Sequence, residues 1–269
     1  MNILGIWDGH DAGAVLLVDG RLAAAVNEER FTRRKLEIDF PSRSIDACLE
    51  IANLSRSAVD IVATSTEDVA KALGRLYPST REAYYQLRRR HAPPGLLTAL
   101  GTRAKYRMTE WPPNPLSRAV SRWTLGRAIT RAGLGHAALQ IFDHHACHAA
   151  TAAYTSGFSS ALVLTIDGVG DGKAATISRY KDGQVVLLAS TPARHSPGVF
   201  FEHVTRLLNM RELEDEGKVM AIADYASPVL DDRNPLRAML SARGLTFVTA
   251  RPGHDLQRPL REVHWHYPN

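Results

Sequence analysis

The amino-acid sequence predicts an α/β protein that contains a duplicated unit. Three short apolar runs separated by Asp-Gly turns open the chain, and the same pattern returns about 160 residues later. Between the two copies, runs of strand length alternate with longer segments of helical periodicity, as they do in α/β proteins. Chance similarity between two hairpins is the alternative explanation of the repeat. At 269 residues, the chain is long enough for one large domain or two smaller ones.

The first copy predicts three strands. NILGIW ends at Asp8-Gly9, AGAVLLV follows, and RLAAAVNEER begins after Asp19-Gly20. An Asp-Gly pair between two apolar runs is the strongest short hairpin signal, because both residues tolerate the positive φ that such turns require. The start of the chain therefore predicts a strand, a turn, a strand, a tight hairpin and a third strand.

The segment between the copies alternates helix and strand. Apolar residues at helical spacing predict a helix that Ser42 caps. A buried strand is expected at 59–65, and a short strand at 136–145 leads into a helix that ends near Gly157. Residues 71–131 predict helices interrupted by the prolines of APPG and WPPNP.

The second copy begins with SSALVLTI, which ends at Asp167-Gly168, and continues with KAATISRY, Asp182-Gly183 and QVVLLAS. HSPGVFFEHVTRLLNM then predicts an amphipathic helix, because its apolar residues share one helical face. From position 227 the chain is rich in Pro and Arg and weakly patterned. No later strands and helices equivalent to those of the first unit are expected.

The composition bears on the cellular compartment. No run approaches the ~18 apolar residues that a membrane span needs, and MNILGIWDGHD lacks the basic start of a signal peptide. Only Cys48 and Cys147 are present, which fits a reducing cytosol better than a disulfide-stabilised secreted protein. We therefore expect a cytoplasmic protein with no membrane partner.

The net charge of +5 is unevenly distributed, because residues 71–131 hold 13 Lys and Arg against 2 Asp and Glu. A basic, aromatic-rich segment can bind phosphates or nucleic acid. The alternative is a solvated helical insertion whose Arg stems cover apolar surface. The alternative is favoured here, because no recognised nucleic-acid motif accompanies the charge. A nucleic-acid partner is accordingly not expected.

IFDHHACHAA at 141–150 carries three histidines where a strand runs into a helix. His144 and His148 are four residues apart, so on a helix both rings project from one face and can share a cation. Asp167, at the end of the next strand, is the candidate oxygen ligand, and such a set suits iron, manganese or zinc. Alone, this spacing is more often a pair of surface or capping histidines. Cys147 is expected to be a small buried residue rather than a nucleophile.

Two glycine-rich turns provide candidate residues for cofactor binding. In the first, Gly9 and Asp11 flank His10, whose imidazole could act as a general base while main-chain N–H groups approach a phosphate. In the second, Gly168 and Gly170 lie at the strand end where α/β proteins hold metals or nucleotide phosphates. Such loops can equally satisfy their own backbone groups.

Lys218, in the stretch LEDEGKVM, is a further candidate for contact with an anionic cofactor. The alternative is a charged turn without a ligand. NEERFTRRK at 27–35 also has two interpretations. Its Arg and Lys side chains could contact phosphates, or the stretch could be a strand end whose salt bridges contribute little to stability.

These stretches together resemble one family. ILGIWDGHDAGAVLLVDG, AAAVNEERFTRRK, DHHACHAA, LTIDGVGD and EDEGKVMAIADYA occur in the order and spacing of the NodU/CmcH-type O-carbamoyltransferases. The resemblance covers residues 1–225, and 71–131 contributes little to it. It implies an actin/Hsp70/sugar-kinase-like (ASKHA) fold of two duplicated lobes, related to the tRNA threonylcarbamoyladenosine transferase. On this basis 1–158 forms the first lobe, with a basic helical insertion at 68–134, and 159–269 begins a second, incomplete lobe.

The resemblance also implies a reaction. In the family, a YrdC-like domain makes carbamoyladenylate from carbamoyl phosphate and ATP, and the kinase-like domain transfers the carbamoyl group to an acceptor hydroxyl. By this resemblance, His10 is the base for the hydroxyl. His144, His148 and Asp167 are ligands of a divalent cation, with Fe²⁺ preferred over Mn²⁺ or Zn²⁺.

The sequence departs from the family in three respects. It has no match for the YrdC-like domain, for the later glycine-rich nucleotide segment or for the aspartate that completes the metal site. We therefore expect a fragment, one subunit of a split enzyme or a truncated remnant, with a metal site one ligand short. A C-terminal half and a YrdC-like domain or subunit are the expected partners.

The leading prediction is an ATP- and metal-dependent O-carbamoyltransferase that acts on a hydroxylated small molecule. Threonylcarbamoyl transfer to tRNA is the second possibility, with the basic segment 71–131 as its best support. A non-catalytic nucleotide- or partner-binding module is the third, supported by the expected incomplete second lobe. The retained His10, His144, His148 and Asp167 argue against a decayed remnant.

Overall fold

The computed structural model describes residues 1–88, 104, 107–227, 234–251 and 260. Contacts divide the chain into two compact units: residues 1–67, 71–82 and 114–144 form the first, and residues 68–70, 83–113 and 145–269 form the second. The break predicted at APPG and the terminal HWHYPN lie outside the described residues. The described part contains no helix that is long and apolar enough to cross a membrane.

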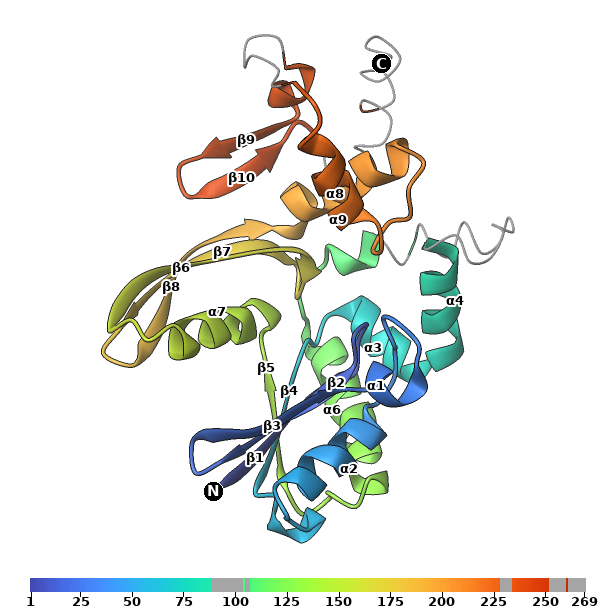
Figure 1. The fold of residues 1–269 in the computed structure, drawn as a ribbon, viewed down its shortest axis with the longest axis vertical. Coiled ribbons are helices and arrows are strands. Elements are labelled where there is room, and N and C mark those ends of the chain that lie inside the picture. Colours follow the sequence, from blue (N-terminus) through green and yellow to red (C-terminus); the bar gives the residue numbers. More distant parts are fainter. Residues whose placement is uncertain (89–103, 105–106, 228–233, 252–259, 261–269) are drawn as a thin grey trace. The chain divides into compact units, whose positions relative to one another are not determined.

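The first unit is built on a five-stranded mixed sheet with the order β3-β2-β1-β4-β5 (Figure 1). Its strands are β1 (Asn2–Trp7), β2 (Gly13–Val18), β3 (Arg21–Asn27), β4 (Ile61–Ser65) and β5 (Ala138–Phe142). β1, β2 and β3 form an antiparallel meander, whereas β1, β4 and β5 run parallel. Asp19 and Gly20 have φ of 49° and 77°, which confirms the predicted tight hairpin.

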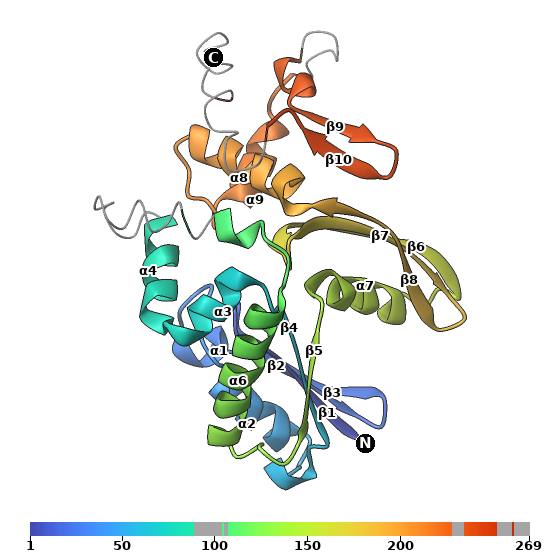
Figure 2. The ribbon, with the colours of Figure 1, turned by 180° about the vertical axis from the view of Figure 1, so that it is seen from behind.

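Helices connect and flank these strands, and two of them complete the core. They are α1 (Glu29–Thr32), α2 (Ser42–Ile51), the 3₁₀ turn η1 (Arg56–Ala58), α3 (Val69–Leu76), α4 (Pro78–Arg88) and α6 (Pro115–Arg131). Figure 2 shows the ribbons of α2 and α6 from behind. Both helices contribute to one apolar cluster with β1, β2 and β4, which includes Leu4, Leu16, Ile45, Val62, Leu125 and Ile129. Burial of each such side chain stabilises the fold by about 1.5–3 kcal/mol.

The start of α2 corrects one prediction. Ser42 is the first helical residue and caps nothing, and Pro41 occupies the N-cap position. The buried Glu28 carboxylate caps the helix instead, because it accepts hydrogen bonds from the backbone N–H of Arg43 (3.2 Å) and Ser44 (2.9 Å). The cap therefore comes from the end of β3 rather than from the helix's own sequence.

The last and longest segment of the second unit opens with α7 (His144–Thr155), whose first residue still belongs to the first unit. A three-stranded antiparallel sheet follows, with the order β6-β7-β8 for β6 (Ser160–Gly170), β7 (Lys173–Lys181) and β8 (Gln184–Pro192). β6 was predicted to end at Asp167-Gly168, but it continues to Gly170 after an interruption of its pairing with β7. Asp171-Gly172 makes the turn, and both residues have positive φ.

α7 covers one face of this sheet. Ala149 and Ala153 of the helix pack against Val163 of β6, with Tyr180 and Val185 beside them. Side chains alternate along a strand, so the other face of the sheet carries different residues. Its large apolar side chains are exposed: Leu162, Leu164, Ile166, Val186 and Leu188. Within the described residues β6 forms an edge of the sheet. We call these five side chains and the edge of β6 the open apolar face.

The remaining elements are η2 (Ala193–His195), α8 (Pro197–Leu207), α9 (Glu216–Ala223), η4 (Pro235–Ala238), β9 (Leu240–Arg243) and β10 (Thr246–Thr249). The amphipathic helix is confirmed, because Phe200, Val204 and Leu207 pack against the buried Met239 and Leu260. The β9–β10 hairpin was not predicted. Its signal is Gly244, which has φ 58° and lies between the short runs LSAR and TFVT.

The α/β class and the repeated antiparallel meander are confirmed. The two copies differ in their first turn, because the five residues 8–12 join β1 to β2 whereas two residues join β6 to β7. Contacts divide the chain after His144. The lobe boundary at 158 and 159 stays a prediction.

Candidate functional site

The site begins at one edge of the first unit's sheet. β1, β4 and β5 run parallel and end at Trp7, Ser65 and Phe142, so their carboxyl ends lie at the same edge. Loops that follow parallel strands at such an edge are where α/β proteins place ligands. The sheet therefore brings together three loops that are far apart in sequence, namely those after Trp7, Ser65 and Phe142.

α7 starts directly after β5 and presents the two predicted histidines. His144 and His148 lie four residues apart on this continuous helix. Together with Asp167 they form a group in which each residue offers one ligand atom, and these atoms all lie within 4.8 Å of one another. His148 Nε2 lies 3.6 Å from Asp167 Oδ2. The three residues predicted as metal ligands are thus close enough to share one cation.

His144 is oriented by its neighbours in the first unit. Its Nδ1 lies 3.3 Å from Thr66 Oγ1, and its ring centroid lies 5.7 Å from that of Trp7. Thr66 has φ 73°, a conformation that β-branched residues rarely adopt. Arg75 donates to the Thr66 carbonyl at 2.7 Å and helps to hold it there. A hydroxyl at Nδ1 fixes the orientation of the His144 ring, as outer partners of metal-bound histidines do.

Asp167 sits where the pairing between β6 and β7 is interrupted, between Ile166 and Gly170. Its Oδ1 accepts a hydrogen bond from the Gly168 N–H at 2.6 Å. The start of α8 packs against its main chain: Ser196 Oγ donates to the Asp167 carbonyl at 3.1 Å, and a Cβ on Gly198 would lie 2.7 Å from that oxygen. Sequence reasoning missed both residues, although Ser-Pro-Gly at a helix start is a readable signal.

The Asp167 carboxylate changes the chemistry of His148. Its hydrogen bond with the imidazole raises the pKa of His148 above the ordinary value, and partial burial opposes that shift. Without a cation, the pair therefore favours the imidazolium form. Because a metal binds only the neutral imidazole, protons and a cation would compete for His148.

The neighbours of these histidines have structural roles. His145 is fully buried, and its Nδ1 lies 2.8 Å from Thr165 Oγ1 on β6. Thr165 Oγ1 in turn lies 2.7 Å from Thr176 Oγ1 on β7. His145 therefore anchors α7 to the sheet. Cys147 is half-buried, less enclosed than the sequence predicted.

His10 lies in the loop between β1 and β2 and is half-exposed. Its Nδ1 is 3.2 Å from Asp11 Oδ2, and its carbonyl accepts a hydrogen bond from Trp7 Nε1 at 2.6 Å. The Trp7 and His10 ring centroids are 6.4 Å apart. Gly9 allows this packing, because a Cβ there would come within 2.2 Å of the Trp7 ring. Trp7 thus contacts both the predicted base and the first predicted metal ligand.

A buried charge cluster lies beneath the same loop, and sequence reasoning missed it. The Asp8 carboxylate is paired with Arg75 (Nε to Oδ2, 2.9 Å) and with Lys71 (Nζ to Oδ1, 2.9 Å). Arg81 donates to the Asp8 carbonyl at 3.0 Å. Burial acts to raise the pKa of Asp8, but the charges of Arg75 and Lys71 outweigh it and hold that pKa well below its ordinary value.

Lys71 differs from the two arginines. Its ammonium lies 4.1 Å from the centroid of the Trp7 ring, and burial lowers its pKa to about 8 against the opposing attraction of Asp8. The cluster holds more cationic than anionic groups, so it places positive potential under the loop that carries His10. The signal in the sequence was the spacing of Lys71 and Arg75 on one turn of a helix, within the predicted insertion.

The other predicted cofactor residues are spread over the second unit. Gly168 follows Asp167 in the interrupted part of β6, and Gly170 pairs with Lys173 across the turn. Lys218 lies on α9, is mostly exposed and donates to Asp215 Oδ1 at 2.7 Å. Lys218 is thus engaged in an ion pair one turn away on its own helix.

Known sequences resemble the chain over most of its length. Residues 2–239 match the family described as carbamoyltransferase N-terminus. Nodulation protein NolNO of Sinorhizobium fredii is 33% identical over 221 residues, which cover 81% of this chain and 28% of that protein. Uncharacterized protein sll1178 of Synechocystis is 29% identical over 238 residues, which cover 85% of this chain and 36% of that protein. The chain spans about a third of the length of these relatives.

Among solved structures, YeaZ from Pseudomonas aeruginosa matches with a TM-score of 0.35 and 12% identity, over 70% of this chain and 64% of that one. That likeness is too slight to add to the fold that the strands themselves define. The family match is of another kind, because it spans both sheets and includes His10, His144, His148 and Asp167. The chain belongs to the carbamoyltransferase N-terminus family.

Proposed function

We propose that this chain forms part of an ATP- and metal-dependent O-carbamoyltransferase and holds the site where the acceptor hydroxyl reacts. The observation that carries the proposal is the grouping of His144, His148 and Asp167 within 4.8 Å of one another in a member of this family. The donor is carbamoyladenylate, made from carbamoyl phosphate and ATP, and the acceptor is a hydroxylated small molecule.

The donor set fits a divalent cation. Two imidazole nitrogens and one carboxylate oxygen, with no thiolate among them, suit Fe²⁺, and also Mn²⁺ or Zn²⁺. A cation bound there supplies Lewis acidity that polarises a carbamoyl or phosphate oxygen. The neighbours add support, since Thr66 orients His144 and the Gly168 N–H orients Asp167.

His10 is the proposed general base. Its Nδ1 lies 3.2 Å from Asp11 Oδ2, so the carboxylate can orient the imidazole that accepts the proton of the acceptor hydroxyl. The hydroxyl oxygen then forms a bond to the carbamoyl carbon. The bond between that carbon and the phosphate oxygen breaks, and AMP leaves with the electron pair. A positioned base contributes about 10²- to 10⁴-fold to such a step.

The buried cluster of Asp8, Lys71, Arg75 and Arg81 supports the same assignment. The donor carries a phosphate, and an excess of positive charge attracts anionic substrates. Gly9, Asp11, Gly168 and Gly170 are the proposed main-chain contacts for the nucleotide. Lys218 would have to leave Asp215 to join them.

Further polypeptide completes the proposed enzyme. The open apolar face leaves Leu162, Leu164 and Ile166 exposed along an edge strand, as expected of a surface that receives another strand or helix. In the first unit, the equivalent strand β1 has neighbours on both sides, β2 and β4. A C-terminal half and a YrdC-like domain or subunit are the proposed partners, and the cytoplasm is the proposed location.

The test combines metal content with turnover. The chain, loaded with Fe²⁺ under anaerobic conditions, is compared with His144→Ala and His148→Ala, with the exposed His136→Ala as the matched control. AMP release is then followed with carbamoyl phosphate, ATP, a set of small alcohols, the C-terminal half and a YrdC-like protein. We expect one bound metal per chain in the unchanged protein and the control, and loss of metal and turnover in the other two.

His10→Ala separates the base from the metal site. It should keep the metal and lower the rate of transfer about 10²- to 10⁴-fold. Equal metal content in all the histidine variants would refute the metal site. A His10→Ala protein that keeps full turnover would refute the assignment of the base.

A further inference from the structure

The outward face of α6 is unusual for a helix that covers a sheet. Its inner face is apolar or small and buried, through Ser117, Ser121, Leu125 and Ile129. Solvent-facing positions of such a helix normally carry mixed charges. Here the outward face instead combines Arg residues with Trp123, whose side chain is 54% exposed.

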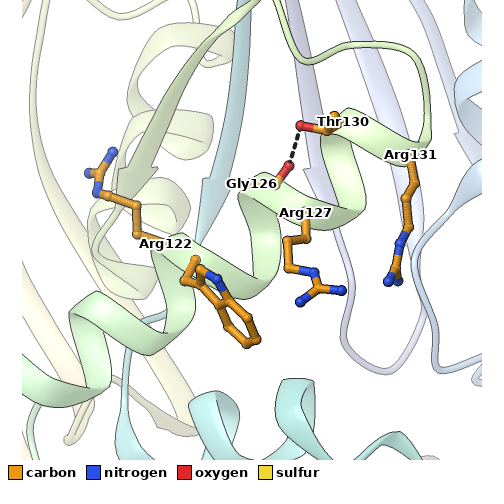
Figure 3. Close-up of a pocket in the computed structure, with 6 residues that line it drawn as sticks. Arg122, Gly126, Arg127, Thr130 and Arg131 are labelled. Atoms are coloured by element: carbon orange, nitrogen blue, oxygen red, sulfur yellow. Dashed lines mark hydrogen bonds between the residues drawn. The ribbon is translucent and has the colours of Figure 1, made fainter.

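A shallow hollow lies on this face (Figure 3). Its lining residues all come from α6: Arg122, Trp123, Gly126, Arg127, Thr130 and Arg131. Gly126 opens the hollow, because a Cβ there would meet no atom within 4 Å. Figure 3 shows Arg127 and Arg131 extending toward the same side of the helix and Arg122 toward the opposite side.

The aromatic and cationic groups form one surface. Arg127 Cζ lies 4.9 Å from the centroid of the Trp123 ring, so the guanidinium and the indole are in cation–π contact. Planar groups of this kind are the platforms on which unpaired bases stack in single-stranded nucleic-acid sites.

Within the part of the chain that the structure describes, most of the positive charge on this face has no carboxylate partner. Arg118, one turn away, lies 3.8 Å from Glu67, but Arg122, Arg127 and Arg131 form no ion pair with any carboxylate that the structure describes. Arg122 and Arg131 lie nine positions apart on α6, about 13 Å along its axis. Nine positions also place the two side chains on opposite flanks of the helix, and Arg122 Nη1 donates to the Leu139 carbonyl at 3.4 Å. An extended strand that crosses the outward face from one flank to the other can contact both flanks with successive phosphates, which one small anion cannot do.

We propose that the outward face of α6, comprising Arg122, Trp123, Gly126, Arg127, Thr130 and Arg131, binds single-stranded RNA. The arginines contact phosphates, and a base enters the hollow that Gly126 opens beside Trp123. A membrane-binding helix needs a broad apolar stripe. On α6 the large exposed apolar side chains are Leu116 and Trp123, two turns apart, with a guanidinium over the Trp123 ring. RNA therefore fits this face better than a lipid surface. The proposal is independent of carbamoyl transfer.

The test is fluorescence anisotropy of a labelled single-stranded RNA 12-mer of mixed sequence, titrated with the full chain over a range of salt concentrations. The triple variant R122Q/R127Q/R131Q is compared with R21Q/R43Q/R179Q, which removes the same charge from exposed positions elsewhere. We expect the first triple variant to flatten the slope of log K against log salt by about 2, because each phosphate contact on a single strand contributes about 0.7. The control variant R21Q/R43Q/R179Q should keep most of the slope of log K against log salt.

Trp123→Ala tests the stacking. It should weaken RNA binding about tenfold while leaving the binding of heparin, a polyanion without bases, unchanged. Three outcomes overturn the proposal: equal effects of the two triple variants, equal effects of Trp123→Ala on RNA and heparin, or tighter binding to anionic phosphatidylserine vesicles than to the RNA. Circular dichroism of each variant checks that the fold is intact, since every changed residue is exposed.

Discussion

The imidazole of His148 and the carboxylate of Asp167 approach to 3.6 Å, from Nε2 to Oδ2, although the residues lie on different elements. α7 carries the first, and the interrupted part of β6 carries the second. The relationship makes the site sensitive to pH, because the carboxylate raises the pKa of His148.

When a chelator keeps the chain free of metal, the ion pair between His148 and Asp167 should stabilise the folded chain at low pH. The raised pKa in the folded state means that the contribution is complete below the ordinary His value of about 6.5 and is lost as pH rises through the raised value. Because both side chains are partly exposed, we expect less than about 1 kcal/mol. Urea unfolding across this pH range measures it. Asp167→Asn should abolish this pH dependence, and an unchanged profile would contradict the pairing.

Metal binding should depend on pH in the opposite direction to the stability of the metal-free chain. Protons and the cation compete for His148, so the affinity for Fe²⁺ or Zn²⁺ should rise with pH through the same range. Titration calorimetry at several pH values would show it, together with proton release on binding. An affinity that does not change with pH would mean that His148 is not a ligand.

The start of α8 should control the position of Asp167. Gly198→Ala places a Cβ 2.7 Å from the Asp167 carbonyl, and the resulting shift should lower stability by about 1–3 kcal/mol and weaken metal binding. Gly217→Ala is the matched control, because it is also near a helix start and its Cβ would meet no atom within 4 Å. The control should be neutral or stabilise by up to about 1 kcal/mol. Equal changes of stability and metal affinity in the two variants would disprove the contact between Gly198 and the Asp167 carbonyl.

The buried cluster should depend on Asp8. Asp8→Asn leaves Lys71 and Arg75 without their counter-charge in a buried site, so we expect a loss of about 3–5 kcal/mol in the free energy of unfolding. Asp60→Asn, which removes an acid from the surface, should cost much less. Denaturant unfolding of both variants checks this, and a small effect of Asp8→Asn would mean that water screens the cluster.

The open apolar face should make the isolated chain self-associate. An exposed edge strand with apolar side chains is a template for pairing with another copy. Leu164→Lys should reduce the association seen by light scattering. Leu22→Lys, at another exposed leucine on β3, should not. A chain that stays monomeric at high concentration without either change would contradict this expectation.

Local patterns were enough to predict much of this structure. The Asp-Gly turns and alternating runs identify β1 to β3 and the core of β6 to β8, because hairpins are set by neighbouring residues. The spacing of His144 and His148 predicts a shared helical face for the same reason. Asp167 could be proposed as their partner only because it follows a strand end, which is a general position for ligands.

Features that depend on distant partners could not be predicted in this way. Ser42 looks like a cap, but Glu28 arrives from the end of β3 and displaces it. Asp8, Lys71 and Arg75 meet only because α3 folds back under β1, and the sequence shows them as separate charges. The extension of β6 beyond Asp167 depends on its pairing with β7, which no local signal specifies.

The packing of Trp7 on Gly9 has an evolutionary consequence. A Cβ at position 9 would come within 2.2 Å of the indole, so the two positions are energetically coupled. Among homologues, a side chain at position 9 should occur only where position 7 carries a smaller ring or none. The indole also contacts the rings of His10 and His144, so a lineage that exchanges both residues would reshape the neighbourhood of the base and of the first metal ligand at once. Covariation of positions 7 and 9 should therefore mark lineages whose reaction has diverged.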